Sequence, residues 1–190
     1  MKPTLRKDML KTLAAMSAQT IAAKSHLACQ ALADLAEFRS AATVMIYLPM
    51  PRELDTAPLA LAAWHQDKTV VAPRVVWGQG HMVPVLCRSL DDGDLTPPRF
   101  GVREPMEGEP WPLEEIDLVV APALAFDRRG HRLGRGGGFY DRFLASSMLK
   151  ATACGLGFAE QVVDELPTAD NDHPLDILVT DKEVLRFGPH

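Results

Sequence analysis

The chain has 190 residues, of which 47% are hydrophobic and 24% charged, and a formal net charge of −5. This composition is typical of a globular protein with one core, and the mildly acidic charge argues against a dedicated nucleic-acid-binding protein. The three cysteines are too far apart to suggest a zinc cluster or a disulfide framework. No apolar run reaches the roughly 20 residues of a membrane span, and the first residues lack a signal peptide's apolar core, so we expect a cytoplasmic protein without membrane contact.

Apolar periodicity divides the first part of the chain into helices and strands. The first forty residues have the spacing of amphipathic helices, with Ser17 as the expected N-cap between two of them. Residues 43–49 form a short apolar run of strand formers, residues 54–66 a helical pattern and residues 68–75 a second strand pattern. This strand–helix–strand order predicts two parallel strands joined by a right-handed crossover.

The rest of the chain continues this alternation around a long irregular connection. Residues 90–116 are rich in proline, glycine and acidic residues, and a connection of this length is usually functional or mobile. We expect strands over residues 81–89, 117–122, 152–158 and 176–180, and helices over residues 138–149 and 160–166. Together the elements predict one α/β domain over residues 1–190, with three layers, a mostly parallel sheet and helices on both faces.

Two of the expected strands are followed by charged or glycine-rich residues. Ligands of open α/β sheets bind beyond the carboxyl ends of the strands, which is where these residues would lie. Residues 43–49 are followed by Arg52 and Glu53, and residues 117–122 are followed by the segment RLGRGGGFYDRF, which begins at Arg132. A glycine-rich turn that leads into a helix exposes backbone N–H groups and adds the partial positive charge of the helix start. The segment therefore predicts an anion site.

Charged side chains flank these glycines. The guanidinium groups of Arg132 and Arg135 suit phosphate oxygens, and the Asp141 carboxylate has the chemistry of a Mg²⁺ ligand. The spacing matches neither of the common nucleotide-binding glycine fingerprints. Glycines alone would favour a tight turn packed against a neighbour, with solvated arginines. The arginines, the helix start and the aspartate together favour a phosphate site.

The longer segment APALAFDRRGHRLGRGGGFYDRFL resembles the signature of the 5-formyltetrahydrofolate cyclo-ligases, also called 5,10-methenyltetrahydrofolate synthetases. The segments MKPTLR, YLPMPRELDTAPL, FGVREP and NDHPLDILVT resemble other elements of that family, in the same order along the chain. The resemblance implies a three-layer α/β fold. It also implies an ATP- and Mg²⁺-dependent enzyme that converts 5-formyltetrahydrofolate to 5,10-methenyltetrahydrofolate and releases ADP and phosphate.

Carried over by position, the resemblance implies a role for each matching residue. The residues that contact ATP would be Lys2, Arg6, Arg132, Leu133, Gly134, Arg135, Gly136, Gly137, Gly138, Phe139 and Tyr140. Those that contact the folate would be Leu48, Glu53, Arg135, Gly136, Gly137, Gly138 and Phe139. Asp141 and Asp176 would hold Mg²⁺. Arg135 and Asp141 would be catalytic, because phosphoryl transfer needs positioning and charge neutralisation more than covalent help.

This chain departs from the family pattern at the glycine turn. Many members carry Gly-Lys-Gly there, whereas this chain has Gly137 in place of the lysine. The charge of that lysine could come from Arg135, Arg142 or Lys2. Phe139 stands where a tyrosine is common, which removes a hydroxyl group but keeps the ring.

Three functions remain open at this point. The first is the ligase, whose partner would be a reduced folate with or without a polyglutamate tail; nothing in the sequence predicts an oligomeric state. The second is a catalytically weakened relative that binds folate or nucleotide, which the missing lysine motivates. The third is a sugar-phosphate isomerase or transferase of similar α/β build, which would turn over without nucleotide.

Overall fold

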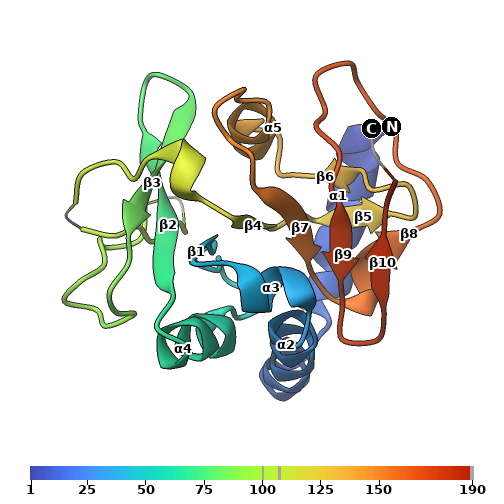
Figure 1. Cartoon of the computed structure of the whole chain (residues 1–190). Coiled ribbons are helices and arrows are strands. Elements are labelled where there is room, and N and C mark those ends of the chain that lie inside the picture. The colour runs from blue at the N-terminus through green and yellow to red at the C-terminus, as the bar shows by residue number, and fades with distance from the viewer. Residues whose placement is uncertain (100, 107, 189–190) are drawn as a thin grey trace.

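The computed structural model describes residues 1–99, 101–106 and 108–188, and a seven-stranded sheet lies at its centre (Figure 1). In spatial order the strands are β10 (Val184–Arg186), β9 (Ile177–Val179), β7 (Thr152–Leu156), β4 (Leu118–Ala121), β1 (Thr43–Met45), β2 (Thr69–Val76) and β3 (His81–Leu86). The strands from β9 to β2 are parallel to one another, and both edge strands pair antiparallel. The mostly parallel sheet predicted from the sequence is confirmed.

One face of this sheet is covered by helices from the first third of the chain. They are α2 (Ala18–Ala33), α3 (Ala36–Ser40) and α4 (Ala57–His65), as Figure 1 shows. Ser17 caps α2 as expected, because its hydroxyl oxygen accepts the Thr20 N–H at 3.1 Å. The preceding helix, α1 (Lys2–Ala14), adds two buried side chains to the same core.

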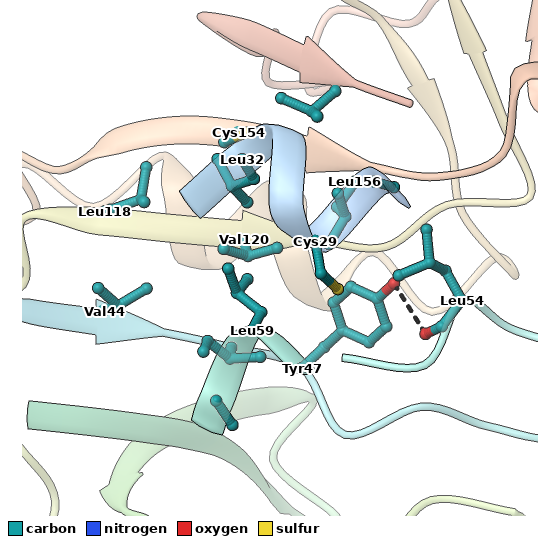
Figure 2. Packing of buried hydrophobic residues seen from close by; sticks show 14 of the residues in the cluster. Cys29, Leu32, Val44, Tyr47, Leu54, Leu59, Leu118, Val120, Cys154 and Leu156 are labelled. Carbon is teal, nitrogen blue, oxygen red and sulfur yellow. Dashed lines mark hydrogen bonds between the residues drawn. The ribbon is translucent and has the colours of Figure 1, made fainter. Parts of the chain in front are cut away.

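Aliphatic side chains make up most of the core on this face, together with a few aromatic and cysteine side chains (Figure 2). Val44, Leu118 and Val120 of the sheet pack with Leu32 of α2 and Leu59 of α4, and all five side chains are fully buried. Burial of each such side chain contributes roughly 1.5–3 kcal/mol to folding. This core therefore fixes the sheet against the helices.

The opposite face of the sheet has a second core. Successive residues of a strand point to opposite faces, so Met45 and Val119 lie on the side away from α2. Phe143 and Leu144 of α5 (Phe139–Leu144) cover them there, together with the chain around the 3₁₀ turn η1 (Leu113–Glu115). Helices on both faces and three layers are confirmed. Among the described residues, no helix has the length and apolarity needed to cross a membrane.

A separate three-stranded sheet holds the chain that leads to the glycines. Its central strand, β5 (Ala125–Asp127), pairs with β6 (Arg132–Leu133) and with β8 (Val162–Val163). The helix expected over residues 160–166 is wrong, since only the 3₁₀ turn η2 (Ala159–Gln161) precedes β8. Two adjacent valines lose rotamer freedom in a helix, and the open edge of β5 offers them backbone partners.

The helix expected over residues 138–149 is shorter than predicted. α5 ends at Leu144, and the N–H groups of Ser146 and Leu149 bond to carbonyls three residues back in successive turns. A helix of six residues aligns few peptide dipoles, so its start contributes little to an anion site.

Asp127 organises the loop between β5 and β6. Its side chain is fully buried, and one carboxylate oxygen accepts the N–H groups of Arg129 and His131, both at 2.9 Å. The other oxygen accepts the Leu166 N–H and contacts His131 Nδ1, both at 3.0 Å. Burial by itself raises the pKa of Asp127, but these hydrogen bonds outweigh it, and the pKa lies below its ordinary value.

We predict that Asp127→Asn lowers the free energy of unfolding by about 2–4 kcal/mol at neutral pH, because an amide NH₂ cannot accept the N–H groups it would face. Because the pKa of Asp127 in the folded state lies below the unfolded-state pKa of about 3.9, the ionised carboxylate stabilises the fold at pH values above about 3.9. This stabilisation is lost as the pH falls through the folded-state pKa. Urea unfolding measured between pH 7 and pH 2.5 should show that the difference in the free energy of unfolding between Asp127→Asn and wild type shrinks as the pH falls. The exposed Asp164→Asn is the control. Equal stability of Asp127→Asn and wild type at pH 7 would contradict this role.

Candidate functional site

A cavity of about 390 Å³ opens where β1 and β4 end, the expected position for a ligand of an open α/β sheet. It lies between the turn after β1, the end of β2 and the glycine segment. Its lining residues are Tyr47, Leu48, Met50, Glu53, Pro73, Val75, Trp77, Met82, Val102, Pro122, Ala123, Arg132, Gly134, Arg135, Gly137, Gly138, Phe139, Tyr140 and Asp141. Most of the residues implied for folate binding therefore share one cavity with part of the implied ATP cradle.

The turn after β1 forms one wall of the cavity. The Glu53 N–H bonds to the Met50 carbonyl at 3.0 Å, and the residues between them are Pro51 and Arg52, whose φ is 71°. A proline followed by a residue with positive φ is the geometry of a type II turn, in which glycine usually takes the second place. Arg52 offsets this strain by donating from Nη1 to the carbonyl of Ala14, at 2.8 Å, at the carboxyl end of α1.

Glu53 joins this turn to the glycine segment across 82 residues of chain. Its Oε2 accepts the Met50 N–H at 2.9 Å, and its Oε1 accepts both Nε and Nη2 of Arg135, at 3.1 and 3.0 Å. The Glu53 side chain is 11% exposed, whereas that of Arg135 is 38% exposed. A largely buried acceptor and a more exposed cation therefore lie side by side at the cavity.

The three consecutive glycines are required for different reasons. Gly136 and Gly138 have φ angles of 109° and 64°, which residues with a side chain rarely adopt. Gly137 has no such angle, but a Cβ atom there would lie 2.7 and 2.8 Å from two carbons of the Phe139 ring. The ring therefore occupies the space that a side chain at position 137 would need.

A buried ion pair closes the glycine segment. Arg132 precedes the glycines and Asp141 follows them, and Arg132 Nη2 donates to Asp141 Oδ1 at 2.6 Å. Arg132 Nη1 also donates to the His173 carbonyl. Only 3% of the Arg132 side chain is exposed, and this burial lowers the pKa of Arg132 while the charge of Asp141 opposes the change. Leu133, between Arg132 and the glycines, packs in the core, so only its backbone can serve a ligand.

The helix α1 brings its two implied ATP contacts to the same region. Arg6 Nε donates to the Gly134 carbonyl at 2.9 Å, and Lys2 Nζ pairs with Asp172 at 2.7 Å. These contacts join residues 128 and 170 positions apart in the chain. The structure thus places Arg6 against the glycine segment, whereas Lys2 pairs with Asp172.

The two residues implied as Mg²⁺ ligands do not meet. Asp176 precedes β9, and its carboxylate accepts the Ala153 N–H at 2.7 Å beside the start of β7, so it lies at the amino edge of the parallel strands and lines a different hollow. Asp141 instead contacts the His173 N–H at 3.3 Å. Because His173 directly follows Asp172, the structure brings Asp172 rather than Asp176 into the neighbourhood of Asp141. One signal was available in the sequence, since Asp176 begins an expected strand, whereas Asp172 lies in the turn before it.

Tyr140 contributes a hydroxyl group without a partner. Among the described residues, its buried oxygen has no hydrogen bond, although the ring lines the cavity. Burial raises the pKa of Tyr140, so the hydroxyl stays protonated and can donate. Buried polar atoms almost always have a partner, which makes this oxygen a natural contact for a ligand.

The long connection before β4 reaches the cavity. Val102 lines it, and the buried Glu104 fixes this part of the chain to β2, since its Oε1 accepts the Val75 N–H at 2.8 Å. The Arg99 guanidinium lies 4.5 Å from the ring centre of Trp77, at the end of β2. Apart from the 3₁₀ turn η1, the described residues of this segment have the expected irregular structure, and part of the segment forms a wall of the cavity.

Comparison with known proteins gives a consistent result. The model of the 5-formyltetrahydrofolate cyclo-ligase family matches residues 1–181. The 5-formyltetrahydrofolate cyclo-ligase of Haemophilus influenzae is 35% identical over 185 residues, which cover 93% of this chain and 98% of the relative. The mouse protein of the same name is 29% identical over 184 residues, with 92% and 91% covered.

Solved structures show the same fold. The NMR structure of the 5,10-methenyltetrahydrofolate synthetase of Aquifex aeolicus has a TM-score of 0.84 and 32% identity, and covers 100% of this chain and 94% of its own. The synthetase of Mycoplasma pneumoniae has a TM-score of 0.77 and 22% identity, with 95% and 99% covered, and supports the fold alone.

We predict that Gly137→Lys weakens binding of ATP, the nucleotide that the sequence implies, even though it adds the positive charge that this chain lacks. The cause is the Cβ atom, which would displace the Phe139 ring. Gly137→Ala should therefore weaken ATP binding by a similar factor, about tenfold for a misplaced loop, in a calorimetric titration. Gly93→Ala, which has open space and no positive φ, is the control. Tighter binding by Gly137→Lys would show that added charge outweighs the displaced ring.

Proposed function

The chain belongs to the 5-formyltetrahydrofolate cyclo-ligase family and is a ligase of folate one-carbon metabolism that converts 5-formyltetrahydrofolate to 5,10-methenyltetrahydrofolate, and we propose that the cavity after β1 and β4 is where this reaction takes place. The observation that carries the proposal is the contact between Glu53 and Arg135. It joins an acceptor suited to pterin N–H groups to a cation suited to phosphate, in one cavity beside a glycine segment.

The reaction needs a better leaving group than a formyl oxygen. The family uses ATP, and transfer of its γ-phosphoryl group to that oxygen makes the oxygen leave readily as phosphate. N10 of the folate then attacks the formyl carbon, the ring closes, and ADP and phosphate are the products. The protein's work is to hold the two substrates in line and to neutralise charge.

Glu53 and Arg135 divide this work. Glu53 accepts hydrogen bonds from the pterin N–H groups, which compete with its contact to Arg135. Arg135, more exposed and on a flexible stem, is then free to bind phosphate oxygens. Leu48 and the Phe139 ring give the apolar surface on either side of the folate. The Tyr140 hydroxyl donates to whichever substrate oxygen reaches it.

Asp141 and Asp172 fit a Mg²⁺ ion shared with phosphate. Among the described residues, each keeps one carboxylate oxygen without a hydrogen bond, since Asp141 uses Oδ1 and Asp172 uses Oδ2. No group of three or more potential metal ligands occurs in the described part of the chain. Mg²⁺ usually has one or two protein carboxylates and takes its other oxygens from water and phosphate, which matches this pair. When bound, the ion would neutralise charge on the phosphates.

We predict that Asp141→Asn and Asp172→Asn each lower Mg²⁺-dependent turnover by about 10²-fold, as expected when a group that stabilises charge at a transferring phosphoryl group is lost, and change folate binding far less. Asp176→Asn is the matched control, because its amide oxygen still accepts the Ala153 N–H. Magnesium titrations of turnover, with folate binding measured by fluorescence quenching, separate the two effects. If Asp176→Asn lost as much Mg²⁺-dependent turnover as Asp172→Asn, Asp176 would have to be a metal ligand.

A direct assay tests the proposed function as a whole. Purified protein mixed with 5-formyltetrahydrofolate, ATP and Mg²⁺ should give the absorbance of the methenyl product, and omission of ATP should abolish it. Folate binding without product would identify the catalytically weakened relative that the missing lysine motivates. Turnover of a sugar phosphate without nucleotide would support the isomerase instead.

A further inference from the structure

Basic side chains around the glycine segment fall into two groups according to their partners. Three of them have a carboxylate partner at 2.6 to 3.0 Å: Arg132 with Asp141, Lys2 with Asp172, and Arg135 with Glu53. Two others, Arg6 and Arg142, bond only to backbone carbonyl groups among the described residues. A carbonyl group satisfies hydrogen-bond donors but does not cancel a positive charge, so these two guanidinium groups leave uncompensated charge at the site.

Arg142 is held against the glycines by three contacts. Its Nε donates to the carbonyl of Gly80, in the turn between β2 and β3, and its Nη2 donates to the carbonyl of Gly137, both at 2.7 Å. The guanidinium carbon lies 5.3 Å from the centre of the Phe139 ring. The side chain is therefore fixed in place although the residue is exposed.

The third nitrogen of Arg142 lies where only a glycine allows it. Nη1 is 2.7 Å from the position that a Cβ atom on Gly138 would occupy, and it makes no hydrogen bond among the described residues. Gly138 thus has two requirements, a left-handed backbone and room for this guanidinium group. Arg6 lies near Gly136. Its guanidinium carbon is 3.8 Å from the position that a Cβ atom on Gly136 would occupy. The two free charges border the glycine turn at both of its ends.

Other sources of positive charge are weaker here. The six-residue α5 adds little dipole, and position 137 has no lysine. Before the folate binds, the charges of Arg135 and Lys2 are matched by carboxylates. We propose, resting on the proposed function, that Arg142 supplies the charge of the absent lysine and, together with Arg6, binds the phosphate groups of ATP at the glycine turn.

If Arg142 has this role, its loss should affect the binding of ATP and of folate differently. Arg142 does not line the cavity that holds Glu53, so its loss should leave the folate contacts in place. A purely structural role would act on both substrates, because the same glycine segment borders the folate cavity. The ratio of the two effects is therefore the informative measurement.

The experiment uses the full-length protein with Arg142→Gln, Arg142→Lys and Arg129→Gln. Glutamine keeps an NH₂ group that can donate to a carbonyl but removes the charge, whereas lysine keeps the charge. Arg129 lies in the loop just before this segment, pairs with Glu165 on an exposed surface at 2.8 Å, and is the matched control. Steady-state KM values for ATP and for 5-formyltetrahydrofolate are measured at low and moderate salt, together with direct titration of MgATP.

Arg142→Gln should raise the KM and the Kd for ATP about tenfold, as expected from the loss of one charge-assisted phosphate contact, and change the folate KM less than about twofold. Arg142→Lys should retain most of the ATP affinity, Arg129→Gln all of it, and the salt dependence of ATP binding should fall in Arg142→Gln.

Equal losses for ATP and folate, or Arg142→Lys as weak as Arg142→Gln, would overturn the proposal and make Arg142 a structural tie between Gly80 and Gly137. Wild-type ATP affinity in Arg142→Gln would also overturn it, while the activity of the wild-type protein would leave the proposed function standing. A wild-type protein that neither binds MgATP nor forms the methenyl product would overturn both.

Discussion

Arg132 and Asp141 stand at the two ends of the glycine segment, and their side chains meet at 2.6 Å. Arg132 is almost completely buried and also binds the carbonyl group of residue 173, so one guanidinium group holds three pieces of chain. Buried ion pairs add little net stability, but removal of one partner leaves a costly unpaired charge. The pair therefore acts as a geometric constraint, which closes the glycine turn into one shape.

That shape has consequences for each neighbouring group. With the ends of the segment held, Gly136 and Gly138 take left-handed conformations, and the Phe139 ring fills the space beside Gly137. Carbonyl groups of the segment then accept from Arg6 and Arg142, which approach from different elements. In this chain, which has glycine instead of lysine at position 137, an aromatic ring and a guanidinium group therefore occupy the space around that position.

Much of the fold and of the site could be predicted, because both depend on local sequence patterns. The buried runs at residues 43–49 and 117–122 indicated parallel strands, and ligand chemistry was expected just after them, where the cavity lies. The helix expected over residues 160–166 was wrong because Val162 and Val163 pair with β5, a partner that no local pattern reveals. The structure places Asp176 away from Asp141 for a similar reason: the sequence shows that a residue adjoins a strand, but the sheet decides at which edge it lies.

The sequence by itself determined the α/β class, the glycine turn and the residue types that a phosphate and folate site needs, because these depend on spacing and side-chain chemistry along short stretches of chain. Only the tertiary structure decided which charges are already paired. Glu53 and Arg135 are 82 positions apart, and Lys2 and Asp172 are 170 apart, so their contacts follow from the order of strands in the sheet. Electrostatic attraction acts through space, and which cations remain free for a ligand is therefore a property of the folded chain.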